Sequence, residues 1–325
     1  MARSGPGGLF GQQMVRRTDH YPPRSGPVVA VDLGGTNLRV AVVDETGTVL
    51  GRHRVPTPTQ GSITDFLADI ITELGADPGY PAVVAVPGLV DYERRSALWA
   101  PHLPSGWATE LSEDHLTSRL CRRVCIANDA DLAAVGETYF GAGRNASDVA
   151  FLTVSTGIGA GVLLNRRLVR GRRSVAEIGH TIIDRRAFSN GEPATLEELA
   201  SGSNIPRLAQ IGAVRARTGE QLEALEESGD DRATAVWMQI VESVTIGIIN
   251  LAWCFGPEVI IVGGGIGRER ALLDPLREQL AEATSAMAME FCLVEAELAD
   301  DAGLIGGAAW RRANDARTDK VDTTG

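Results

Sequence analysis

Lysine is almost missing from this chain. Of 325 residues only Lys320 is a lysine, and arginine supplies nearly all of the positive charge. A Walker-type phosphate loop needs a lysine directly after its glycines, and a pyridoxal phosphate enzyme needs one for its Schiff base. Because Lys320 lies near the C-terminus and outside any glycine-rich turn, the sequence argues against both kinds of site.

Cysteine, excess positive charge and long apolar runs are also scarce. The four cysteines form no CxxC pair, so we expect buried, reduced thiols and neither a disulfide framework nor a zinc ribbon. A net charge of -11 argues against a nucleic-acid surface, which needs clustered cations. The longest apolar run, residues 246–255, is too short to span a bilayer, and the N-terminus has no signal-peptide pattern. These features predict a cytoplasmic protein that binds neither nucleic acid nor a membrane.

Two glycine-rich turns are the most informative segments present. They are DLGGTNLR at residues 32–39 and STGIGAG at residues 155–161, and each lies between two runs rich in β-branched residues. This pattern predicts β-hairpins, whereas a dinucleotide-binding fingerprint needs a helix after its glycines. For either copy alone a plain hairpin turn is the alternative. Two copies in matched contexts favour a nucleotide whose phosphates are held between two similar halves.

The order of predicted elements repeats along the chain. Residues 1–27 are rich in Gly, Pro, Ser and Arg without periodicity, which predicts a disordered tail. A meander of three strands follows, then a helix over residues 62–74 and a buried strand over 82–86. Much of this order returns after Val149, and a last helix is expected from Ala308. The repeat predicts an α/β protein of two halves around a central cleft.

Eight short motifs occur in a distinctive order. They are DLGGT (32–36), VPGLVD (86–91), NDAD (128–131), STGIGAG (155–161), AEIGH (176–180), LEELASG (196–202), VGGG (262–265) and LIGGAA (304–309). In this set and order, over about residues 28–315, the chain resembles the ROK family of repressors and sugar kinases.

The resemblance implies a fold, a domain division and an activity. The implied fold is the α/β actin-like ATPase (ribonuclease H-like) fold, with two domains around a central cleft. The implied domains are residues 28–127, completed by a C-terminal helix of about 308–318, and residues 128–307. The implied activity is that of an ATP-dependent, glucokinase-like sugar kinase, expected to be a homodimer.

A kinase that acts on a sugar needs a carboxylate to accept the proton of a hydroxyl group. By its place in the NDAD motif, Asp129 is the expected general base, and Asn128 offers a donor and an acceptor to sugar hydroxyls. The structural alternative is that both residues merely cap the helix that follows. The resemblance assigns further sugar contacts to Gly88, Glu177, His180 and Glu197.

The choice of Glu197 over Glu198 depends on its place before Ala200-Ser201-Gly202. A charged start of a helix is the alternative for this pair of glutamates.

Nucleotide binding is expected at the glycine turns and at VGGG, although a GGG run alone is often just a flexible turn. The expected residues are Gly34, Gly35, Thr36, Thr156, Gly157, Gly263, Gly264 and Gly265. Asp32 is expected to hold Mg²⁺ through water, because this ion keeps much of its hydration shell.

The chain departs from the family at the zinc site. Family members usually carry a histidine and a CxCGxxGC stretch between the histidine of ExGH and the glutamate before ASG. The corresponding residues 181–196 contain no cysteine, and His180 alone cannot form a tetrahedral structural site, so no structural zinc is expected.

The expected reaction is phosphorylation of the 6-hydroxyl of a hexose, glucose or a glucose-like or amino hexose. The alternatives are a specialised amino sugar, such as kanosamine or N-acetylmannosamine, and a non-catalytic sugar-responsive regulator.

Overall fold

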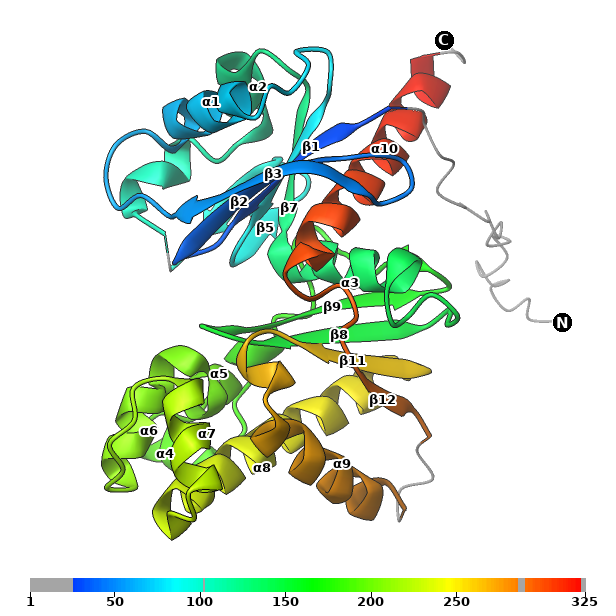
Figure 1. Ribbon diagram of the computed structural model, residues 1–325. Helices are drawn as coiled ribbons and strands as arrows, with labels where there is room; N and C mark the ends of the chain where they lie inside the picture. The colour runs from blue at the N-terminus through cyan, green and yellow to red at the C-terminus, as the bar shows by residue number, and fades with distance from the viewer. Residues whose placement is uncertain (1–25, 102, 286–289, 323–325) are drawn as a thin grey trace, which may run out of the picture.

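Two five-stranded sheets of the same topology organise the protein (Figure 1). The computed structural model describes residues 26–101, 103–285 and 290–322, with side chains as far as Arg312. The tail expected over residues 1–27 lies outside the described residues except for its last two positions.

The first sheet has the strand order β3-β2-β1-β4-β7, antiparallel among the first three strands and parallel from β1 to β4 and β7. Its strands are β1 (Val28–Leu33), β2 (Asn37–Val43), β3 (Val49–Pro56), β4 (Ala82–Val86) and β7 (Val124–Asn128). A separate hairpin pairs β5 (Leu89–Asp91) with β6 (Ser96–Trp99).

The second sheet repeats this topology in the order β10-β9-β8-β11-β12. Its strands are β8 (Val149–Val154), β9 (Ile158–Leu164), β10 (Arg167–Leu168), β11 (Val259–Gly263) and β12 (Cys292–Glu295). Both predicted glycine turns lie in equivalent places, between β1 and β2 and between β8 and β9. The repeat predicted from the sequence is therefore confirmed.

Helices cover both faces of each sheet and produce a layered molecule (Figure 1). α1 (Ile63–Glu73) and α2 (Glu113–Leu120) pack on the outer face of the first sheet. α3 (Asp129–Phe140) and α10 (Ala302–Asp322) lie between the two sheets. The second sheet also carries α4 (Arg185–Asn190), α5 (Leu196–Ala200), α6 (Ile205–Ile211), α7 (Gly219–Glu227), α8 (Asp231–Phe255) and α9 (Arg270–Ser285).

Strand β1 shows why these strands are apolar throughout. Val29 and Val31 pack toward α1 and α2, whereas Val28 and Ala30 face α3 and α10. A strand buried on both faces needs apolar residues at successive positions instead of alternation with polar ones.

The central layer depends on a close crossing of α3 and α10. A Cβ atom at Gly306 would lie 1.8 Å from the carbonyl oxygen of Leu132, and one at Gly136 would lie 2.3 Å from that of Ala302. Real Cβ atoms are not found so close to backbone atoms, so these glycines let the two helices touch. Gly306 of the LIGGAA motif therefore allows α10 to pack closely against α3.

Several elements differ from the sequence-based expectations. α10 begins at Ala302, before the expected Ala308, and α3 begins at Asp129. The prediction of buried thiols is wrong for Cys121, Cys254 and Cys292, which are exposed. These cysteines lie at a helix end, on the outer side of a helix and on an edge strand, where apolar neighbours in sequence do not ensure burial.

Helix α8 is longer than the apolar run recognised in the sequence. By length and composition alone it could cross a membrane, but over half of its most apolar stretch is buried inside the protein. Trp237, Ile240 and Leu251 of α8 pack in the core beside the second sheet. Its apolar character is therefore explained by packing.

Candidate active site

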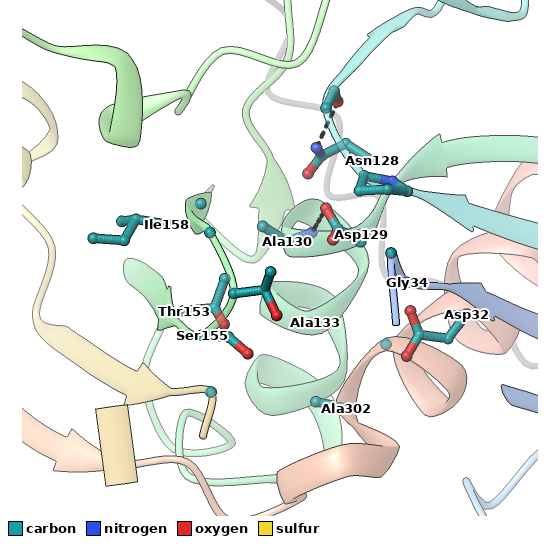
Figure 2. Close-up of a pocket in the computed structure, with 18 of the residues that line it drawn as sticks. Asp32, Gly34, Asn128, Asp129, Ala130, Ala133, Thr153, Ser155, Ile158 and Ala302 are labelled. Atoms are coloured by element: carbon teal, nitrogen blue, oxygen red, sulfur yellow. Dashed lines mark hydrogen bonds between the residues drawn. The ribbon is translucent and has the colours of Figure 1, made fainter. Parts of the chain in front are cut away.

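A cavity of about 280 Å³ lies between the two halves, where β1, β7, β8 and the start of α3 converge (Figure 2). Most residues predicted for the site line it: Asp32, Gly34, Gly35, Gly88, Asn128, Asp129, Thr156, Gly157, Glu177, His180, Glu197, Gly264 and Gly265. Segments more than 200 residues apart in the chain thus contribute to one wall. The expected sugar and nucleotide residues share a single cavity.

Two predicted residues lie outside this wall. Thr36 is exposed, and its carbonyl oxygen accepts a hydrogen bond from Thr57 N at 3.0 Å. Gly263 ends β11, and a Cβ atom there would lie 2.9 Å from the Phe151 ring, so this glycine serves packing. In the same turn Gly264 has a φ of +86°, a conformation that favours glycine.

Asp129 reaches the cavity because it stands where a strand becomes a helix. Asn128 ends β7 and is the N-cap of α3, with its Oδ1 accepting from Asp131 N at 2.9 Å. Its Nδ2 also donates to the carbonyl oxygen of Gly88 at 2.9 Å. Asn128 therefore caps the helix, and it also lines the cavity. Asp129, the first helical residue, nevertheless presents its side chain to the cavity (Figure 2).

The surroundings of Asp129 make it a stronger base than an ordinary aspartate. Burial, together with the carboxylates of Asp32 and Glu177, raises the pKa of Asp129 to about 7, although the Ala130 N–H bond opposes this shift. A carboxyl group with a pKa near neutrality can be deprotonated in the cell and still accept a proton effectively. This is the behaviour required of a general base.

Asp32 also lines the cavity (Figure 2), and it is part of a chain of charges with Arg39 and Asp300. Arg39 donates from Nη1 to Asp32 Oδ2 at 2.7 Å and pairs through Nη2 with Asp300 at 3.1 Å. Burial raises the pKa of Asp32 by more than the Arg39 guanidinium lowers it. The charge of Asp32 is thus partly balanced by a cation on the neighbouring strand.

The donor set at Asp32 suits Mg²⁺. Its carboxylate points toward the cavity in Figure 2 and offers the hard oxygen ligand that this ion prefers. The described residues contain no group of three or more His, Cys, Asp and Glu side chains placed to hold a metal ion. The protein would therefore supply one carboxylate, and phosphate oxygens and water would complete the coordination, which is the usual way of binding Mg²⁺.

Two glutamates and a histidine from the second half, Glu177, Glu197 and His180, also line the cavity. Glu177 Oε1 accepts from Ser174 Oγ at 2.9 Å, and Glu197 Oε2 accepts from Ile158 N at 2.8 Å. Glu198 instead closes a capping box with Thr195 at the start of α5. Helix capping therefore uses Glu198, while Glu197 lines the cavity.

The segment of residues 181–196, which contains no cysteine, is held by its own backbone. Ile183 N donates to the carbonyl oxygen of Ala194 at 2.9 Å, and Leu196 N donates to that of Thr181 at 3.0 Å. Between these residues lies the short helix α4, capped by the Asp184 side chain. Hydrogen bonds across the base of this loop thus connect its two sides.

Sequence reasoning missed part of the wall, including Arg39, Trp99, Thr153, Ser155, Arg268 and Asp300. Arg39 and Ser155 lie inside the two quoted glycine motifs, so their positions could have been inferred from the hairpins. Trp99 had no such signal, because the β5-β6 hairpin that carries it was not predicted.

A sequence model of the ROK family matches residues 28–314. The chain belongs to the ROK family. It is 31% identical over 319 residues to a glucokinase of Streptomyces coelicolor, covering 89% of this chain and 99% of that protein. It is 29% identical over 294 residues to an N-acetylmannosamine kinase of Yersinia pestis, covering 89% and 99%.

Among solved structures, a ROK family glucokinase from Streptomyces griseus in complex with glucose and AMPPNP matches with a TM-score of 0.72 and 29% identity. The match covers 88% of this chain and 99% of that chain. The predicted actin-like ATPase fold is thus confirmed for this ROK protein.

Proposed function

We propose that this ROK protein transfers the γ-phosphoryl group of ATP to the 6-hydroxyl of a hexose, with Asp129 as the general base. The broader class, an ATP-dependent sugar kinase, follows from family membership and from similarity along nearly the whole length of kinase relatives. The observation that carries the finer proposal is the cavity, which is lined by both Asp129 and Asp32.

The reaction needs a hydroxyl group to lose its proton as its oxygen attacks phosphorus. A sugar hydroxyl is a weak acid, so it needs a nearby base at the moment of attack. With its pKa raised to about 7, Asp129 accepts this proton. Asn128, Glu177, His180 and Glu197 supply hydrogen-bonding groups that orient the hydroxyls and bring one oxygen to Asp129.

The phosphates would lie against the two glycine turns, where backbone N–H groups can approach them closely. When bound at Asp32, Mg²⁺ supplies charge neutralisation for the phosphoryl oxygens. Arg39 and Arg268 are the arginines on the described wall of the cavity, Arg39 paired with Asp32 and Asp300 and Arg268 paired with Glu295.

The remaining expectations belong to the same proposal. They are glucose or an amino hexose as acceptor, a cytoplasmic homodimer, no binding to nucleic acid or membranes, and no structural zinc.

A phosphorylation assay across glucose, mannose, glucosamine, N-acetylmannosamine and kanosamine tests this proposal. With ATP and Mg²⁺ we expect one hexose to be turned over far faster than the others, and ³¹P NMR of the product to show a 6-phosphate. Activity should disappear when Mg²⁺ is withheld and persist with a zinc-selective chelator. Absence of phosphorylation of every sugar, or a phosphate on another oxygen, would refute it.

A further inference from the structure

Trp99 ends β6 and faces the cavity, although nothing in the sequence marks it as functional. Trp99 is 45% exposed to solvent, which is unusual for so large an apolar residue. The ring centroids of Trp99 and His180 lie 5.1 Å apart, with their planes at 62°, in an edge-on arrangement. Trp99 comes from the hairpin of the first half and His180 from the second half, so the two rings meet across the cavity mouth.

The backbone around Trp99 is firmly connected to the catalytic residues. Trp99 pairs with Leu89 in the hairpin, and a Cβ atom at Gly88 would lie 2.3 Å from the Trp99 carbonyl oxygen. Gly88 in turn accepts the hydrogen bond from Asn128 Nδ2. The backbone of Trp99 is therefore held close to Gly88, whose carbonyl group is bound by Asn128.

Polar and apolar groups both line this part of the cavity. Asn128, Asp129, Glu177 and Glu197 offer hydrogen bonds, whereas Trp99, Pro87 and Pro101 contribute apolar surface. A pyranose has matching chemistry, because its hydroxyls lie around the ring edge and its C–H groups form an apolar face. Ligand sites commonly combine a large aromatic surface with a few directed polar groups.

We propose that Trp99 is a sugar-binding residue whose indole covers the apolar face of the bound hexose, opposite the hydrogen-bonding groups around Asp129. This inference rests on the proposed function and identifies a residue of the sugar site outside the motifs that defined that site. A role confined to packing is disfavoured, because the core tryptophans Trp107, Trp237 and Trp310 are almost fully buried, unlike Trp99.

Trp253 is a matched control. It is also exposed, at 63%, but it lies on α8 and does not line the cavity. The experiment titrates wild-type protein, Trp99→Phe, Trp99→Ala and Trp253→Phe with glucose, and separately with the best substrate of the sugar panel, in the absence of nucleotide. Tryptophan fluorescence reports contact with the indole, calorimetry gives the Kd, and melting temperature verifies folding.

We expect a saturable fluorescence change in the wild type and in Trp253→Phe, and its loss in Trp99→Phe. Trp99→Ala should raise the Kd of the sugar about tenfold, as for loss of a well-packed aromatic contact, and leave the KM of ATP unchanged. The sugar Kd of Trp99→Phe should lie between those of the wild type and Trp99→Ala. Folded Trp99→Ala that binds and phosphorylates sugar like the wild type would overturn this inference alone. A wild-type protein that neither binds nor phosphorylates any sugar of the panel would overturn both this inference and the proposed function.

Discussion

At the residue scale, the proposed base Asp129 predicts how activity depends on pH. Because burial and two neighbouring carboxylates raise its pKa to about 7, the carboxyl is largely protonated, and unable to accept a proton, below that pH. We expect log kcat/KM for the sugar to rise with a slope near one up to about pH 7 and then to level off. The measurement is a pH series of initial rates.

Glu177 provides an internal test of this pH dependence. Glu177→Gln removes one of the like charges that raise the pKa of Asp129, so the midpoint of the profile should move to lower pH even where the rate itself falls. A flat profile between pH 5 and 8 in the wild type would assign the proton transfer to another group.

The residues of the cavity differ in whether they could be located from the sequence. Motif positions located most of the cavity wall, because strand ends and glycine turns are short-range features. The orientation of Trp99 depends on a contact between segments far apart in the chain, and no local pattern around it contains that information. The capping role of Glu198 is different, because Thr195 and Glu198 form a local capping box whose Thr-x-x-Glu pattern is visible in the sequence.

At the element scale, the crossing of α3 and α10 determines the spacing of the two sheets. A methyl group at Gly306 would lie 1.8 Å from a backbone oxygen that cannot move without displacing α3. We expect Gly306→Ala to lower stability by about 1–3 kcal/mol, as for other overpacked interiors, and to lower the melting temperature by several degrees.

Gly303→Ala is the control in the same helix. Its Cβ atom would meet only the Asp32 side chain, at an ordinary 3.9 Å, and alanine has the higher helix propensity. Its melting temperature should therefore equal or exceed that of the wild type. Equal melting temperatures for both variants would mean that α3 and α10 do not need this close approach.

The first residue of a helix was harder to predict from the sequence than the presence of the helix. The start of α10 at Ala302 adds a turn that includes Gly303, which lines the cavity, and η5 (Ala299–Asp301) just before it carries Asp300, the partner of Arg39. This turn serves two environments, because Gly303 lines the cavity whereas Leu304 and Ile305 are buried in the core. The tertiary environment sets the boundary there.

At the scale of the whole molecule, duplication explains why the fold could be predicted. Two matched glycine turns implied two matched sheets, and the strand orders confirm this. The short edge strand β12 and the β5-β6 hairpin were not predicted, since their few residues show no clear alternation. The hairpin is the more serious omission, because it carries Trp99 to the cavity mouth.

Asp32 and Asp129 line one cavity, and the proposed function requires that Asp129 is the general base. The most direct measurement compares kcat and the sugar Kd of wild-type protein and Asp129→Asn, with Asp131→Asn as control. Asp131 is also a buried aspartate, but it does not line the cavity. The Tyr92 hydroxyl donates a hydrogen bond to Asp131 Oδ2 at 2.7 Å, and the side-chain oxygen of an asparagine can accept this bond as well. We predict that Asp129→Asn loses about 10²–10⁴-fold in kcat while its sugar Kd stays within a few-fold, and that Asp131→Asn retains most of its turnover. Wild-type kcat in folded Asp129→Asn would contradict the account.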